Sequence, residues 1–152
     1  MDITQEDLRK SGEVIYYSMF KEKLPDSIKF YLNTVSDSAA KLEFDYEDFL
    51  NIENMHLDVI DVAKDINIQV SRKVLLFYQL KYDSGKMILQ LEDSLKHELA
   101  HLYLLLHKLP FDDKSRLFKQ FSRKYSFTLR DTEYSYSEFK YLCNKRITKL
   151  KE

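Results

Sequence analysis

The spacing of apolar residues changes along the chain, and the first third has the spacing of helices. Apolar positions recur every three or four residues over residues 4–23 and again over 25–35, so both segments are predicted to be helical. Pro25 would stand in the first turn of the second helix, where its missing N–H is tolerated. Residues 57–64 predict a further short helix, while the acidic and aromatic segment 42–52 gives no clear prediction.

A period of two follows this helical part. Ile66, Ile68 and Val70 alternate with polar residues, which predicts a strand with one buried face. Residues 74–82 are rich in β-forming side chains, and residues 86–89 follow an Asp-Ser-Gly turn, so each segment predicts a further strand. We therefore expect a small antiparallel sheet of about three strands.

The remainder of the chain returns to helical spacing. Residues 94–109 contain neither Gly nor Pro and carry leucines at helical spacing, and residues 112–125 predict another helix. A last helix is expected from Ser135, which forms a capping-box pattern with Glu138. This order predicts an α+β fold that is mainly helical, with the sheet before the helix at 94–109 and a helical N-terminal portion over residues 1–65.

Length and composition set the frame for this fold. A chain of 152 residues with 44% hydrophobic residues can bury one sizeable core, so residues 1–152 are expected to form a single domain. Cys143 is the one cysteine, no apolar run approaches the length of a membrane span, and the N-terminus is charged. These features predict a cytoplasmic protein without a disulfide framework, and they argue against secretion.

Charge is unevenly distributed, although the net charge is −1. Residues 37–66 contain nine acidic and two basic residues, whereas residues 111–152 contain eleven basic and six acidic residues. In the helix expected over 112–125, the basic residues would face solvent opposite an apolar stripe that includes Phe118 and Phe121. This is the pattern of an ordinary amphipathic helix, so neither nucleic acid nor a membrane is an expected partner, and no oligomeric state is indicated.

The helix expected over residues 94–109 contains the sequence HELAH, which has the form HExxH. Residues four apart share one face of a helix, so His97 and His101 could bind one zinc ion while Glu98 faces the same place. Zinc lowers the pKa of water that it binds and polarises a carbonyl group, and a neighbouring carboxylate can accept the proton of that water. The motif therefore predicts peptide hydrolysis, with His97 and His101 as zinc ligands and Glu98 as the general base.

The motif is the last of three runs, DVAKDINIQV, MILQL and LKHELAHLYLLLH, that follow one another over residues 58–107. Their order resembles the core of small bacterial and phage peptidases of the ImmA/IrrE-like group, although only HELAH is specific. The resemblance implies a zincin-like fold and a zinc endopeptidase that cleaves a protein, which in the better-known members is a transcriptional repressor. A second resemblance is to SprT-like metallopeptidases, through HELAH and RLFKQFSRKYSF, but this chain lacks their C-terminal cysteine pairs.

Zinc needs a third protein ligand, and a histidine is one candidate. His107 has the spacing from His97 that metzincins use, but Leu104 replaces the glycine of that pattern and no methionine follows the motif. In a continuous helix His107 would lie about 9 Å along the axis from His101 and about 120° around it, which one ion cannot bridge.

Acidic residues are the other candidates for the third ligand. In the ImmA/IrrE-like group this ligand is an acidic residue on a following helix, and Glu138 is the first candidate because the helix that it opens can pack across the motif helix. Glu133, Asp131 and Asp113 come next. Each of these acids could equally cap a helix or be solvated, so the alternatives stay open.

The function that follows is a zinc metallopeptidase whose substrate is a protein, for example a regulator or repressor. Such a substrate would bind as an extended strand against the edge of the sheet. A second interpretation is a catalytically inactive zincin-like module, of phage or mobile-element type, that binds a partner protein. A third is a small helical protein in which HELAH has arisen by chance, and this one predicts no bound zinc.

Overall fold

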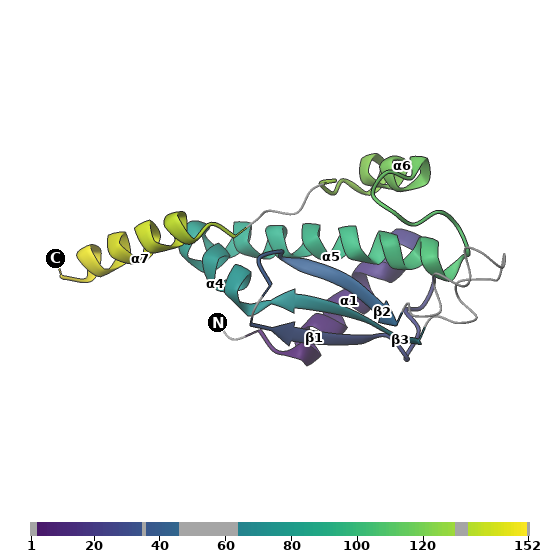
Figure 1. The fold of residues 1–152 in the computed structure, drawn as a ribbon, viewed down its shortest axis with the longest axis horizontal. Helices are drawn as coiled ribbons and strands as arrows, with labels where there is room; N and C mark the ends of the chain where they lie inside the picture. Colours follow the sequence, from purple (N-terminus) through teal and green to yellow (C-terminus); the bar gives the residue numbers. More distant parts are fainter. Residues whose placement is uncertain (1–2, 35, 46–63, 130–133, 152) are drawn as a thin grey trace.

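The structure is a computed structural model that describes residues 3–34, 36–45, 64–129 and 134–151. These residues form one helix, three strands and four further helices (Figure 1). In chain order the elements are α1 (Gln5–Phe20), β1 (Lys29–Asn33), β2 (Ala40–Asp45), β3 (Lys64–Ser71), α4 (Arg72–Lys81), α5 (Ser84–Leu106), α6 (Arg116–Tyr125) and α7 (Tyr136–Lys151).

The sheet is mixed, and β3 is its central strand. The strand order is β1-β3-β2, with β1 parallel and β2 antiparallel to β3. Phe30 of β1 and Leu42 of β2 both lie in register with Ile68 of β3. These three side chains belong to the apolar core, whereas their neighbours in each strand are polar or exposed. One face of the sheet is therefore buried, and the other faces solvent.

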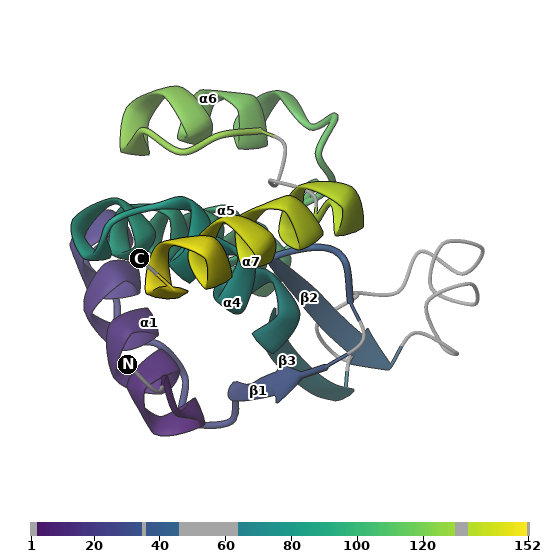
Figure 2. The ribbon, with the colours of Figure 1, turned by 90° about the vertical axis from the view of Figure 1, so that its left-hand side faces the viewer.

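Helices cover the buried face in two layers. α1 packs on β1 and on α5, and α5 also packs on β2, so these two helices form the layer next to the sheet. α6 lies on the side of α5 that faces away from the sheet, as both views show (Figure 1 and Figure 2). α7 packs on α4 and projects from the rest of the molecule.

The long helix α5 is the central element of the fold because it lies between the sheet and α6. Asp83 caps its N-terminus by accepting a hydrogen bond from the backbone N–H of Lys86. Leu95, Leu99 and Leu102 are fully buried toward the sheet and α1. Burial of each such side chain contributes about 1.5–3 kcal/mol to the stability of the folded state. Neither α5 nor any other helix of the described residues is both long and apolar enough to cross a bilayer.

Several of the predicted elements are confirmed. The helix expected over residues 4–23 is α1, which begins with a capping box between Thr4 and Asp7. The alternation around Ile68 is β3, and the helices expected over 112–125 and from Ser135 are α6 and α7. An α+β fold that is mainly helical, with a small sheet of three strands, is therefore correct.

Other predictions are wrong in ways that the packing explains. The predicted helix at 25–35 is a turn followed by β1, because Phe30 and Leu32 alternate into the core beside β3. The sheet is consequently mixed rather than antiparallel. β1 and β2 also lie within residues 1–65, the portion predicted to be helical, and the helix predicted at 57–64 lies outside the described residues except for Lys64, which begins β3.

The two strands predicted after β3 are helices instead. Residues 74–81 fall in α4 and Tyr82 is its C-cap; Ser71 caps the first turn, and the buried side chains recur with the spacing of a helix. Residues 86–89 belong to the first turns of α5, because the Asp-Ser-Gly sequence before them starts a helix rather than a hairpin. The helix that contains HELAH is therefore ten residues longer at its N-terminus than its predicted start at Ser94.

Close packing of α1 on β1 makes Gly12 sensitive to substitution. A Cβ atom added there would lie 2.5 Å from Cζ of Phe30, whose ring is held in the core. Gly12→Ala is expected to destabilise the protein by about 1–2 kcal/mol, because overpacking outweighs the helix propensity gained. Urea denaturation would measure this, with Gly85→Ala as the control. A Cβ at Gly85 meets only Oδ1 of Asp83, at 3.5 Å, so equal losses in both variants would contradict the prediction.

Candidate metal centre

The two histidines of HELAH lie on one face of α5 with their Nε2 atoms turned toward each other. These two atoms are 3.2 Å apart. Both side chains are buried, with exposed fractions of 4% for His97 and 8% for His101. Two nitrogen ligands at tetrahedral positions around a zinc ion stand about 3.3 Å apart, given Zn–N bonds of 2.0–2.1 Å. The observed separation therefore fits two ligands of a single ion.

Backbone carbonyl groups orient both imidazoles. Nδ1 of His97 lies 2.9 Å from the carbonyl oxygen of Thr128, and Nδ1 of His101 is hydrogen-bonded to the carbonyl oxygen of Phe111. A carbonyl oxygen only accepts hydrogen bonds, so each Nδ1 is the donor, and in the neutral imidazole each Nε2 then presents its lone pair. Histidines that bind metals commonly donate their second N–H in this way.

A carboxylate completes the group. Asp113 lies in the loop between α5 and α6, with Oδ1 2.8 Å from Nε2 of His101 and 3.6 Å from Nε2 of His97. Ligand atoms of the three side chains lie within 4.8 Å of one another. The side chain of Asp113 is 67% exposed, so the group is open on one side. An open position is the usual feature that separates a catalytic zinc site from a structural one.

The imidazoles are buried beside an aromatic side chain of α6. The ring of Phe118, on α6, stacks on His101 with a centroid distance of 3.9 Å and meets the edge of His97 at 5.0 Å. Burial lowers the pKa of His101, although the carbonyl group of Phe111 and the carboxylate of Asp113 act in the opposite direction. Burial therefore favours the neutral imidazole, which is the form that binds a metal ion.

Glu98 lies beside the three possible ligands rather than among them. Its side chain is buried, and Oε1 is 4.0 Å from Nε2 of His97. Glu98 borders the same cleft as His97, His101 and Asp113. A carboxylate at this position is placed to exchange protons with a molecule held in the cleft.

The cleft has a volume of about 360 Å³, and three parts of the chain form its walls. One wall is β2, through Lys41, Leu42 and Phe44, and the others are α5 and the loop that carries Asp113. Within the described sheet β2 pairs only with β3, so it is an edge strand. The edge of β2 that faces away from β3 in the described sheet therefore lies beside the candidate metal ligands.

The structure does not bring Glu138, the first candidate for the third ligand, to this group. Its carboxylate forms an ion pair with Lys81 at 2.9 Å, because α7 packs on α4 rather than across the HELAH part of α5. The backbone N–H of Glu138 is capped by the hydroxyl of Ser135. Glu138 therefore joins α7 to α4 instead of completing the metal centre.

Of the remaining candidates for the third ligand that the structure describes, only Asp113 lies beside the two histidines. His107 is the C-cap residue of α5 and pairs with Glu22 at 2.9 Å, away from the histidine pair. Asp131 and Glu133 lie outside the described residues. One sequence signal could have favoured Asp113: it lies seven residues after Leu106, the last residue of α5, with the helix-disfavouring Pro110 between them.

A further carboxylate holds the carbonyl group that orients His97. Asp93, one turn before His97 on α5, accepts hydrogen bonds from the backbone N–H of Thr128 at 2.9 Å and from its hydroxyl at 2.6 Å. The same residue, Thr128, presents its carbonyl oxygen to His97. Asp93 therefore fixes the loop after α6 at the point where that loop contacts the imidazole.

Loss of this contact is expected to weaken metal binding. Asp93→Ala removes both hydrogen bonds to Thr128, so the Nδ1 proton of His97 loses its fixed partner, and zinc affinity should fall about tenfold. Competition with a chromogenic chelator would measure the change. Glu92→Gln, which alters the preceding residue of α5, serves as the control. Asp93→Asn keeps an acceptor for the backbone N–H and should recover part of the affinity. Equal affinity in the wild type and Asp93→Ala would contradict this role.

Comparison of the chain with protein-family models, with curated proteins and with solved structures gives no match. The geometry of the centre is therefore what indicates a function.

Proposed function

We propose that the protein is a zinc metallopeptidase. The observation that carries the proposal is the convergence of two imidazole nitrogens and a carboxylate oxygen next to a buried glutamate in an open cleft. Two imidazoles and one carboxylate form the donor set of a well-known class of zinc hydrolases. A structural zinc site would instead use a closed set of four ligands.

The residues present fit the proposed ion. His97, His101 and Asp113 would hold it, since the separation of the two Nε2 atoms matches ligands of one zinc ion and each Nδ1 faces a backbone carbonyl oxygen. Bound zinc would polarise the carbonyl group of a substrate and increase the acidity of water. Glu98 would accept a proton from the attacking water and deliver it to the leaving amine.

The shape of the cleft supports a peptide substrate. An extended peptide could pair with the edge of β2 that faces away from β3 in the described sheet, since strand addition satisfies its backbone hydrogen bonds without requiring a particular sequence. The side chains of Leu42 and Phe44 would form an apolar wall beside it, and Lys41 would add a positive charge. The proposed substrate is accordingly a protein in an extended segment, such as a regulator or repressor. We also propose a cytoplasmic location, in keeping with the lone free Cys143.

Zinc content is the first test. Protein purified without chelator should contain about one zinc ion per chain by elemental analysis, and His97→Ala/His101→Ala should contain none. Circular dichroism would establish that the variant is folded. Cleavage of a fluorescein-labelled unfolded protein should then depend on the metal and be lost with the same variant. Absence of zinc from both proteins, even after zinc is supplied, would contradict the proposal.

A further inference from the structure

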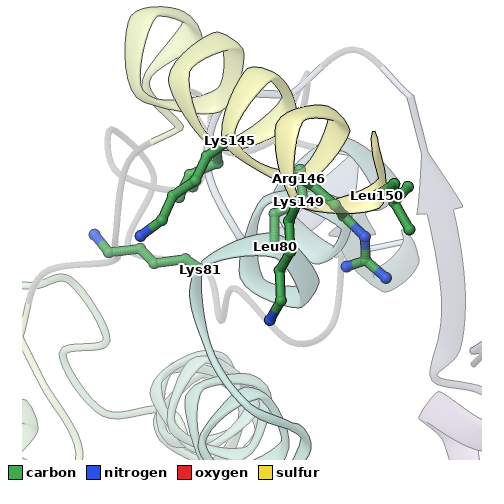
Figure 3. A pocket seen from close by; sticks show the side chains of 7 residues that line it. Leu80, Lys81, Lys145, Arg146, Lys149 and Leu150 are labelled. Atoms are coloured by element: carbon green, nitrogen blue, oxygen red, sulfur yellow. The ribbon is translucent and has the colours of Figure 1, made fainter. Parts of the chain in front are cut away.

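A second hollow, of about 560 Å³, lies between the end of α4 and the second half of α7 (Figure 3). We call it the α4–α7 groove. Leu80 of α4 and Leu142 and Leu150 of α7 supply its apolar lining. It shares no lining residue with the cleft at the metal centre.

Cationic side chains surround this apolar lining. Lys81 is paired with Glu138, but Lys145, Arg146 and Lys149 form no ion pair with any described residue. Figure 3 shows the side chain of Lys149 passing Leu80, with Lys145 extending toward Lys81 on one side and Arg146 on the other. Lys145 and Lys149 are one helical turn apart, a spacing at which like charges repel each other. The positive charge of the groove is therefore not balanced within the described part of the chain.

The helix that supplies these cations is otherwise weakly covered. None of the described residues of α7 is buried, and Leu150 and Ile147 are 78% and 50% exposed. The helix contains five cationic residues and one acidic residue. Exposed apolar residues rimmed by charged side chains are typical of a surface that a partner covers.

We propose that the α4–α7 groove binds an acidic segment of a partner protein, one that carries aliphatic side chains between its carboxylates. The carboxylates would pair with Lys145, Arg146 and Lys149, while the aliphatic side chains would contact Leu80 and Leu150. Such a segment matches both the charge and the apolar lining of the groove. This inference does not depend on the metal centre or on the proposed function.

The lining of the groove favours an acidic peptide over nucleic acid. Phosphates would neutralise the cations, but the leucines would then contact nothing suitable. Unpaired bases are usually held by stacking on aromatic side chains, and the groove residues include no aromatic side chain. The competing occupant can be tested directly with duplex DNA.

Fluorescence anisotropy with a labelled peptide tests the proposal. The probe is a 16-residue helical peptide with leucines on one face and glutamates flanking them, and a second peptide with glutamine in place of glutamate is its neutral counterpart. The wild-type protein should bind the acidic peptide, and Lys145→Glu/Lys149→Glu should weaken that binding about tenfold because attraction becomes repulsion. Lys140→Glu/Lys151→Glu makes the same change in net charge on the same helix outside the groove, and at physiological salt it should alter binding much less.

Each outcome of this experiment bears on the proposal. Selective loss in the groove variant, together with weaker binding of the glutamine peptide, would support it. Equal loss in the two charge-reversal variants would indicate diffuse attraction and overturn it. Binding of duplex DNA without binding of the acidic peptide would assign the groove to nucleic acid, and failure of the wild type to bind the peptide would also overturn the proposal. Leu150→Ser tests the apolar contribution, and it should lower affinity while leaving the fold intact because Leu150 is exposed.

Discussion

Replacing Glu98 with Gln is expected to lower peptide hydrolysis by about 10²–10⁴-fold while leaving zinc bound, because the amide keeps the size of the side chain but cannot accept the proton. Glu98 is buried beside His97 without belonging to the group of possible ligands, so removing its charge changes the chemistry rather than the coordination. Parallel measurement of the cleavage rate and of the zinc content separates these two effects.

A matched substitution makes this result specific. Glu92→Gln removes the same charge from the same helix, six residues before Glu98, and should leave both the cleavage rate and the zinc content unchanged. Full activity of Glu98→Gln would exclude Glu98 as the general base. Loss of zinc from Glu98→Gln would instead indicate that this carboxylate belongs to the metal site itself.

Replacing Asp113 with Ala is expected to lower zinc affinity by more than 100-fold, which exceeds the usual 10–100-fold effect of disturbing an outer contact. Asp113 is the one carboxylate that converges with both Nε2 atoms among the described residues. Its removal should leave two protein ligands, which are too few for a catalytic zinc site. Competition with chelators of graded affinity would measure the loss.

Two other substitutions complete the test of the third ligand. Asp112→Ala alters the neighbouring acid, which borders the cleft and accepts a hydrogen bond from the N–H of Lys114, and should retain zinc. Glu138→Ala should also retain zinc, because its carboxylate is engaged with Lys81. If Glu138→Ala lost zinc and Asp113→Ala kept it, the assignment would be reversed.

The parts of the site that the sequence predicts are those set by local geometry. His97, Glu98 and His101 follow from the spacing of a helix, and that helix is evident from its leucines. Asp113 is different, since its position depends on how the loop after α5 turns back across the helix. Hydrogen bonds to the carbonyl groups of Phe111 and Thr128 leave no trace in the amino-acid sequence, because every residue has a carbonyl group.

The fold shows the same division between local and tertiary signals. A strand of five residues such as β1 is too short for its period to stand out from that of a helix, and its partner β3 lies more than 30 residues further along the chain. In α4, the valine and the aromatic residues favour a strand locally, but their burial against α5 and α7 requires a helix. Segments of mixed propensity are thus decided by contacts that the local sequence does not reveal.

The proposed ligands, the base and the groups that orient them come from one uninterrupted piece of the chain. Asp93 lies at its start, Thr128 at its end, and the ligands, Glu98 and Phe118 lie between them. Closing this hairpin of α5 and α6 brings all of these groups together over short separations in sequence, which is the kind of contact that forms quickly during folding. The sheet contributes none of these groups. Residues 93–128 therefore carry every one of these groups, and the rest of the chain contributes to the centre through the apolar packing that holds α5 in place.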